Sequence, residues 1–143
     1  MTAHQRVLWW AVAVAAVPIA FLWSAVAPPL QANKLPWELI WLVPWAIAEE
    51  IVFRGGVQHA LLQRKALARP WLGISAANLI TSLAFSAAHL LAHSVHQSIA
   101  VFPVSLLLGL AYEQSSGLRL PIALHVWFNL ALVAARWAAG HSA

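Results

Sequence analysis

The stretch Pro36–Leu62, PWELIWLVPWAIAEEIVFRGGVQHALL, decides how this chain folds, because it is long and apolar yet carries two adjacent glutamates, Glu49 and Glu50. The chain has only 4 acidic residues, so half of its acids stand side by side here. A helix of roughly 20 apolar residues crosses the hydrocarbon of a bilayer, where a carboxylate is expensive and by default functional. The stretch therefore predicts a membrane-spanning helix that carries a functional site.

The composition of the rest of the chain is also that of a membrane protein. Apolar residues make up 62% of it and charged residues 8%, against about 25% charged in soluble domains. We expect an all-α polytopic membrane protein of about five transmembrane helices, forming a compact bundle with an intramembrane cavity. The predicted spans are residues 7–27, 37–62, 72–92, 98–115 and 120–139. The predicted breaks are Ala27-Pro28-Pro29, the loop 64–70, the His-rich stretch 89–96 and Ser115-Ser116-Gly117.

Charged residues predict how the chain sits in the bilayer. The apolar run from Val7 is longer than the hydrophobic part of a secretory signal, so we expect an uncleaved first span. Loops on the cytoplasmic side carry an excess of Lys and Arg. A cytoplasmic N-terminus places five cations inside and two outside: Arg6, Arg64, Lys65, Arg69 and Arg119 against Lys34 and Arg136. The preference for Arg, Ala, Leu and Trp points to a GC-rich bacterium, so we expect residence in the bacterial inner membrane.

The same composition limits cofactors and partners. The net charge of +4 follows from the loop cations and does not indicate nucleic-acid binding. The absence of cysteine excludes disulfides, thiolate metal sites and a cysteine nucleophile. Expected partners are the lipid bilayer and a membrane-embedded peptide or protein substrate, with homo-oligomers possible and no cofactor.

The first polar motif is Glu49-Glu50-Ile51-Val52-Phe53-Arg54. On a helix Glu50 and Arg54 stand at i and i+4 with the acid first, the favourable order for an ion pair. Adjacent residues point about 100° apart on a helix, so Glu49 faces elsewhere and is a candidate general base. The alternative is a purely architectural Glu–Arg pair at a helix end, which explains Glu50 better than Glu49.

The second motif is Phe85-Ser86-Ala87-Ala88-His89. The small residues allow close approach of a partner helix, which His89 could then reach. Taken alone, the motif is better explained by an interfacial histidine without a functional role. His93 and His96 follow at i+4 and i+7, which permits a metal site; we expect them instead in the wet loop after the span.

The third motif is His125-Val126-Trp127-Phe128-Asn129. His125 and Asn129 lie one turn apart on a helix face, and two donors so placed could bind an oxyanion. Hydrogen bonding between membrane helices is the alternative. In a simple five-span arrangement His89 and His125 lie at opposite depths. We therefore expect a break or re-entrant segment within His89–Pro103, since irregular backbone at membrane depth is allowed where it lines a cavity.

The order and spacing of these motifs resemble the CPBP family of glutamic intramembrane proteases, which includes type II CAAX prenyl endopeptidases and bacteriocin-processing and immunity-type (Abi) proteins. The family pattern is Glu-Glu-x-x-x-Arg, Phe-x-x-x-His and His-x-x-x-Asn or Asp. The matching residues here are Glu49, Glu50, Arg54, Phe85, His89, His125 and Asn129. The resemblance covers about residues 49–129. It implies one membrane domain over 1–143, with a protease core at about 37–139 and an extra span and loop at 1–36.

The resemblance implies hydrolysis of a peptide bond in a membrane-anchored or lipid-modified protein or peptide. Glu49 would be the general base on a water that His89 helps to hold, and His125 and Asn129 would stabilise the oxyanion. Glu50, Arg54 and Phe85 would support the site, and no metal is implied.

Three other functions remain open at this point. The chain could be a non-enzymatic peptide-binding or immunity protein of the same fold, which would tolerate Glu49→Gln. It could be a metal-dependent membrane hydrolase using Glu49, His89 and His125. A small transporter or proton-coupled channel is disfavoured, because its polar residues would be spread along a pore and not clustered in motifs.

Overall fold

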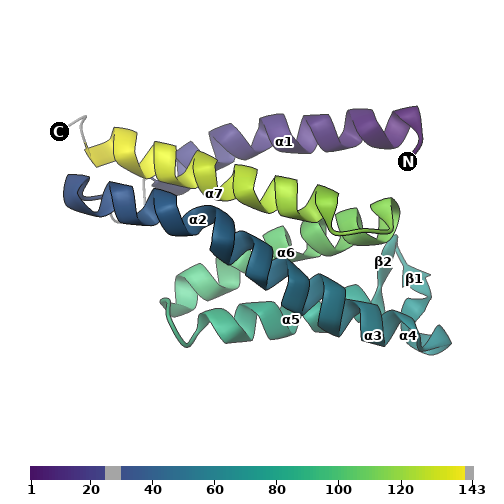
Figure 1. Cartoon of the computed structure of the whole chain (residues 1–143). Coiled ribbons are helices and arrows are strands. Elements are labelled where there is room, and N and C mark those ends of the chain that lie inside the picture. Colours follow the sequence, from purple (N-terminus) through teal and green to yellow (C-terminus); the bar gives the residue numbers. More distant parts are fainter. Residues whose placement is uncertain (25–29, 141–143) are drawn as a thin grey trace. The chain divides into compact units, whose positions relative to one another are not determined.

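The computed structural model describes residues 1–24 and 30–140, and the chain divides into two compact units. The terminal unit contains Met1–Ile47 and Ile122–Ala143, and the central unit contains Ala48–Pro121. The structure is all-α apart from one short hairpin (Figure 1). The predicted break at Ala27-Pro28-Pro29 lies outside the described residues. Whether the chain is one domain, as expected from the sequence, stays a prediction.

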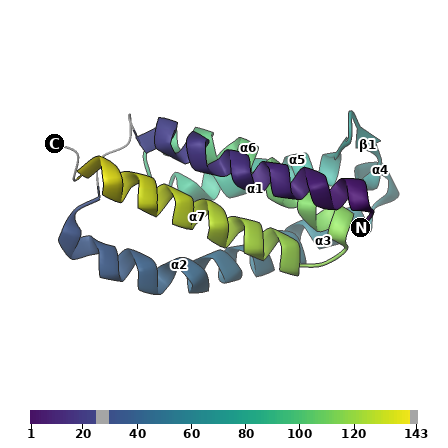
Figure 2. The same cartoon turned by 90° about the horizontal axis from the view of Figure 1, so that it is seen from above.

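The terminal unit packs through two apolar clusters, one of small side chains and one formed by Leu30, Leu42 and Val133. It contains α1 (Ala3–Ser24), the short helix η1 (Ala32–Lys34), most of α2 (Leu35–Glu50) and most of α7 (Arg119–Gly140). The α1–α7 contact, visible in Figure 2, is made by Ala20 of α1 with Ala131 and Ala135 of α7. Such small residues let two helices approach closely, which favours packing between apolar helices in lipid.

Polar contacts supplement this packing, among them a hydrogen bond from the Leu30 amide to the carbonyl of Arg136 (3.2 Å). The indole Nε1 of Trp127 donates a hydrogen bond to the carbonyl of Ala13 (2.7 Å). Arg136 lies 3.9 Å from Glu38, and both side chains are partly exposed. An exposed pair at this distance contributes little to stability, so apolar packing holds the terminal unit together.

The central unit starts with the last turn of α2 and continues without interruption through the π-helix η2 (Ile51–Gln58) and α3 (His59–Leu62). A short helix α4 (Lys65–Ala68) and a hairpin of β1 (Pro70–Trp71) and β2 (Ile74–Ser75) follow. Two antiparallel helices, α5 (Ala76–His89) and α6 (Val95–Ser115), complete it. The predicted 37–62 helix is therefore present as one helical run.

Local signals in the sequence explain where α5 and α6 begin and end. Ser75 caps α5 by accepting a hydrogen bond from the Asn78 amide (2.9 Å). Ser94 and Gln97 form a capping box at the start of α6, which satisfies backbone donors that a helix leaves unpaired. α6 ends at Ser116, which has the left-handed conformation (φ 53°) common at helix C-termini.

Three helices in the described part of the chain, α1, α6 and α7, are long and apolar enough to cross a membrane. The predicted span at 72–92 is wrong at its start, because the hairpin occupies 70–75 and α5 has only 14 residues. Such a helix is about 20 Å long, short of the ~30 Å of a hydrocarbon core. The number of about five spans stays a prediction. A turn at 90–94 separates α5 from α6, and a re-entrant segment at membrane depth within His89–Pro103 stays a prediction.

Candidate active site

Glu49 and His89 face the same small cavity, although they are 40 residues apart in sequence. Glu49 comes from the end of α2 and His89 from the end of α5, and both side chains are half-buried. The cavity has a volume of about 120 Å³ and is otherwise lined by Phe53, Ala88, Ala92 and His93. This volume has room for water and a small reacting group, and not for a drug-sized ligand. A carboxylate and an imidazole are thus placed where they could act on one bound water.

The protonation of His89 follows from its hydrogen bond to the backbone. Its Nδ1 lies 3.0 Å from the carbonyl oxygen of Phe85, one helical turn earlier. A carbonyl oxygen only accepts hydrogen bonds, so Nδ1 must carry the proton. In the neutral imidazole this leaves the lone pair on Nε2. A neutral His89 therefore presents Nε2 to the cavity side as a hydrogen-bond acceptor.

Aromatic packing orients the same imidazole. The His89 ring lies 4.4 Å from the Phe85 ring, and Phe85 packs edge-on against Phe53 at 5.0 Å. Phe85 is 2% exposed. Tight packing of this kind restricts the rotation of His89, which is what a positioned catalytic side chain requires.

His93 is a cavity residue that sequence reasoning missed. It was expected in a wet loop, and it does lie in the exposed turn after α5. Its ring stacks on His89 at 5.4 Å and lines the cavity. The i, i+4 spacing from His89 was the available signal. His96 instead lies in the first turn of α6 and is exposed.

The ion pair that the sequence predicts between Glu50 and Arg54 is present and fully buried. The Arg54 Nε lies 3.1 Å from Glu50 Oε2, and both side chains are 0% exposed. The guanidinium carbon also lies 5.4 Å from the centre of the Phe85 ring, within reach of a cation–π interaction. Arg54 therefore joins the first motif to the second.

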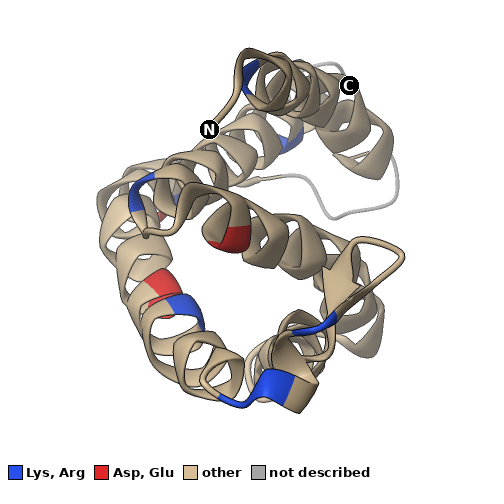
Figure 3. Ribbon diagram, turned by 90° about the vertical axis from the view of Figure 1, so that its right-hand side faces the viewer, with Lys and Arg blue, Asp and Glu red and all other residues tan. Residues whose placement is uncertain are grey.

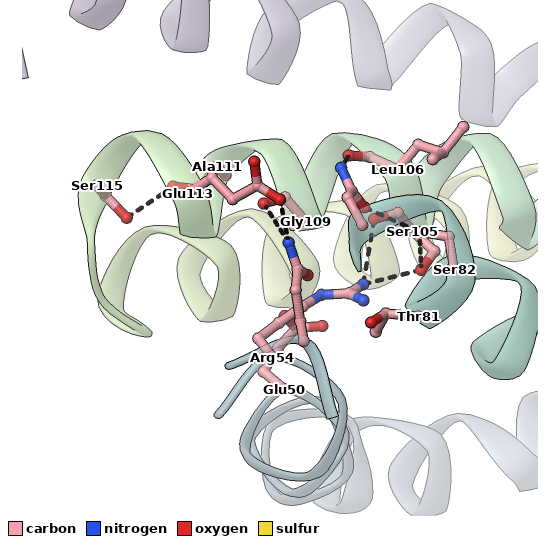
Figure 4. A network of polar contacts seen from close by, with 12 residues as sticks. Glu50, Arg54, Thr81, Ser82, Ser105, Leu106, Gly109, Ala111, Glu113 and Ser115 are labelled. Atoms are coloured by element: carbon pink, nitrogen blue, oxygen red, sulfur yellow. Dashed lines mark hydrogen bonds and ion pairs between the residues drawn. The ribbon is translucent and has the colours of Figure 1, made fainter. Parts of the chain in front are cut away.

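A chain of buried hydrogen bonds continues from Arg54 into α6 and α5 (Figure 4). Arg54 Nη2 donates to the carbonyl and the hydroxyl oxygen of Ser105, at 3.2 and 3.0 Å. The Ser105 hydroxyl donates to Ser82 (3.1 Å), and Ser82 donates to Asn78 Oδ1 (3.1 Å). Asn78 in turn donates to the carbonyl of Leu106 (3.0 Å). Apart from Arg54 Nη1, which has no hydrogen-bond partner among the described residues, these buried polar groups pair with one another, so the network fixes the register of its three helices.

A second set of hydrogen bonds joins the C-terminal end of η2 to α6. Gln58 Nε2 donates to Glu113 Oε1 (2.7 Å) and to the carbonyl of Gly109 (3.1 Å). The same Glu113 oxygen accepts a hydrogen bond from Ser75 (2.6 Å). Sequence reasoning singled out neither Gln58 nor Glu113. Gln58 could have been found because it continues the i, i+4 series of Glu50 and Arg54. Glu113 could have been found because it is a lone acid in an otherwise apolar helix.

The π-helical geometry of η2 sets how these residues project. A π turn is wider than an α turn, and π segments are often found at functional sites. η2 starts directly after Glu50, and its residues Arg54 and Gln58 both donate hydrogen bonds to backbone carbonyls of α6. The widened segment thus follows the acidic pair of the site.

His125 and Asn129 belong to the terminal unit and lie one turn apart on α7. His125 is buried, with 6% exposure, and Asn129 is half-buried. The spacing expected from the sequence is therefore present within α7. Their participation in one site with Glu49 and His89 stays a prediction.

No group of three or more His, Cys, Asp or Glu side chains that could hold a metal ion occurs among residues 1–24 and 30–140. Glu49, His89 and His93 line one cavity, but their side chains are not placed so that all three could bind the same metal ion. The described side chains therefore give no support to a metal centre built from the histidines of the second motif.

These features define the class of protein: an all-α integral membrane protein with a carboxylate and an imidazole on one cavity, as a water-activating hydrolase would need. A family model described as Type II CAAX prenyl endopeptidase Rce1-like matches residues 5–131, and the chain belongs to this family. The match bears out the resemblance seen in the motifs and suggests an intramembrane endopeptidase. No curated protein and no solved structure matches the chain significantly.

Proposed function

We propose that this protein is a glutamic intramembrane endopeptidase that hydrolyses a peptide bond in a membrane-anchored or lipid-modified protein or peptide. The observation that carries the proposal is the shared cavity of Glu49 and His89, together with the hydrogen bond that leaves His89 Nε2 as an acceptor. Family membership supports the choice of a peptide bond as the target.

The first step is attack by water. The water donates one hydrogen bond to the Glu49 carboxylate and the other to His89 Nε2, which turns an oxygen lone pair toward the scissile carbonyl. As the C–O bond forms, Glu49 takes the water proton. The carbonyl π electrons move to oxygen, giving a tetrahedral oxyanion.

The second step is expulsion of the amine. The oxyanion collapses, the C–N bond breaks and the proton held by Glu49 passes to the leaving nitrogen. The products are a carboxylic acid and an amine, and Glu49 is again ionised. His125 and Asn129 are the proposed donors to the oxyanion, a role whose removal typically costs about 100-fold or more in rate.

The buried pair Glu50–Arg54 has a positioning role in this scheme. Glu50 is covalently adjacent to Glu49, and Arg54 is fixed to α6 through Ser105 and to the Phe85 ring. The backbone that carries Glu49 is thereby held against the helix that carries His89. Phe85 contributes by packing on His89.

The bilayer is the proposed setting and supplies the substrate. We propose residence in a bacterial inner membrane with a cytoplasmic N-terminus, following the distribution of loop cations. A cavity of about 120 Å³ holds the reacting group only, so the remainder of the substrate would lie outside it. A terminal segment tethered to lipid meets that condition.

The test is cleavage by the purified full-length chain in lipid vesicles. The probes are peptides that end in a farnesylated CAAX sequence, and the same peptides without the lipid. Wild-type protein should release the terminal residues, and in H₂¹⁸O the new carboxylate should carry the label, because water is the nucleophile. Activity should persist after treatment with a chelator.

Two results would count against the proposal. Loss of activity on chelation, with recovery on adding Zn²⁺, would indicate the metal-dependent hydrolase. Binding of the peptides without any cleavage would indicate the peptide-binding or immunity function.

A further inference from the structure

The hairpin that precedes α5 exposes its apolar residues at its tip. Trp71 is 80% exposed and Leu72 is 83% exposed. The strands pair Pro70 with Ser75 and Trp71 with Ile74, so Leu72 and Gly73 form the two-residue loop. Large apolar side chains at a polar loop position indicate contact with a nonaqueous surface.

The backbone at this tip makes the choice of leucine informative. Both loop residues have positive φ, 51° for Leu72 and 84° for Gly73. Two-residue loops of this kind favour Asn, Asp or Gly at the first position, and a leucine there is strained. Folding alone would favour Asn at position 72, so the exposed leucine indicates a role outside the fold.

Three cations stand immediately before the hairpin. Arg64, Lys65 and Arg69 are all exposed. None of them forms an ion pair with the residues that the structure describes. Glu113, the acid that contacts Ser75 at the base of the hairpin, is engaged by Ser75 and Gln58. Figure 3, which faces this end of the central unit, shows Lys and Arg in the segment after α3.

We propose that the segment 64–73 is an interfacial anchor that binds anionic phospholipid headgroups. The cations would contact the phosphates, while Trp71 and Leu72 enter the boundary between headgroups and acyl chains. This division matches the known preferences of the side chains, since Trp is favoured at the membrane interface and polybasic segments are drawn to anionic leaflets. Charge complementarity selects a lipid surface over a second, equally basic copy of the chain.

The anchor would fix the height of α5 in the bilayer. Ser75 ends the hairpin and caps α5, and His89 is the last residue of that helix. An α-helix of this length spans about 20 Å, so an anchored hairpin places His89 about that far from the interface. This consequence rests on the proposed function of His89; the anchor itself does not.

The absence of cysteine from the chain permits a direct test. The full-length Leu72→Cys variant would carry an environment-sensitive fluorophore at the introduced thiol and be reconstituted into phosphatidylcholine vesicles with or without phosphatidylglycerol. Both leaflets have the same composition, so the orientation of the protein does not affect the result. In the anionic vesicles the emission should shift to shorter wavelength, and a nitroxide high on the acyl chain should quench it.

Ser116→Cys is the matched control, because Ser116 is also exposed and also has positive φ but carries no apolar side chain. Its label should stay in water in both kinds of vesicle. Changing Arg64, Lys65 and Arg69 together to Gln should remove most of the quenching at position 72. Trp71→Cys provides a second reporter if the first variant folds poorly.

Two results would overturn the anchor. In one, the labels at positions 72 and 116 behave alike in anionic vesicles. In the other, shielding of position 72 rises with the ratio of protein to lipid and does not depend on phosphatidylglycerol, which would identify a second copy as the occupant. Neither readout uses cleavage, so failure of the anchor and failure of the protease assignment are distinguishable.

Discussion

At the scale of single residues, the two neighbouring glutamates have different surroundings. Glu50 is completely buried in an ion pair with Arg54, whereas Glu49 is half-buried and lines the cavity with His89. Helical geometry predicts this division from the sequence, because adjacent side chains diverge and i, i+4 side chains meet. The i, i+4 spacing permits His93 to stack on His89, but the sequence does not decide it, since the position of a turn residue depends on how α5 ends.

Glu49→Gln should reduce cleavage by roughly 100-fold or more, because the amide cannot accept the water proton. The change is nearly isosteric, so thermal stability in detergent should be close to that of wild type. Glu38→Gln is the control, since Glu38 makes only a partly exposed 3.9 Å contact with Arg136. Equal turnover of Glu49→Gln and Glu38→Gln would refute the general-base role.

Arg54→Ala should destabilise the protein by roughly 3–5 kcal/mol, because it leaves the buried Glu50 carboxylate without this cation. The measurement is unfolding of the purified protein in mixed micelles at increasing denaturant. Arg119→Ala is the control, since Arg119 is exposed. Similar stability of the two variants would mean that the buried pair does not hold the central unit together.

At the scale of elements, α5 and α6 meet at a point where only glycine fits. A Cβ at position 109 would clash with the side-chain amide of Asn78. The small residues of 82–88 suggested a close helix contact, so part of this interface was predictable. The partner positions on α6, Ser105, Gly109 and Glu113, were not, because register between helices is a tertiary property.

Gly109→Ala should cost roughly 1–3 kcal/mol of stability through overpacking and loss of the Asn78 hydrogen bond. It should also reduce activity, since the same network holds Arg54. Gly56→Ala is the matched control, because its Cβ would meet nothing closer than the Ile51 carbonyl at 3.8 Å. If thermal melting finds the two variants equally stable, the close contact has no energetic importance.

At the scale of the whole molecule, composition and periodicity predict the all-α class and the order of the long helices. They fail at the third predicted span, residues 72–92, where an apolar sequence contains a hairpin and a short helix. Hydropathy cannot distinguish these cases, because an apolar interfacial hairpin and a buried helix both read as apolar. The turn at 90–94 lies in the His-rich stretch 89–96, where the local sequence predicts a break.

The charge distribution predicts that the end of the central unit formed by 64–70 and 116–119 faces the cytoplasm. A membrane-impermeant maleimide should label Ser116→Cys from the cytoplasmic side only. Val95→Cys is the counterpart at the other end of α6, where Val95 is 60% exposed, and it should react from the opposite side. Reaction of both from one side would show that α6 does not cross the bilayer.

The central claim is that Glu49 activates water for cleavage of a membrane-associated substrate. Its most direct test is mass spectrometry of protein termini in membrane and secreted fractions of host cells that express wild type, Glu49→Gln or Glu38→Gln at equal levels. The account predicts a small set of termini that are present with wild type and Glu38→Gln and absent with Glu49→Gln. Identical termini in all three strains, with Glu49→Gln complementing a deletion, would contradict it.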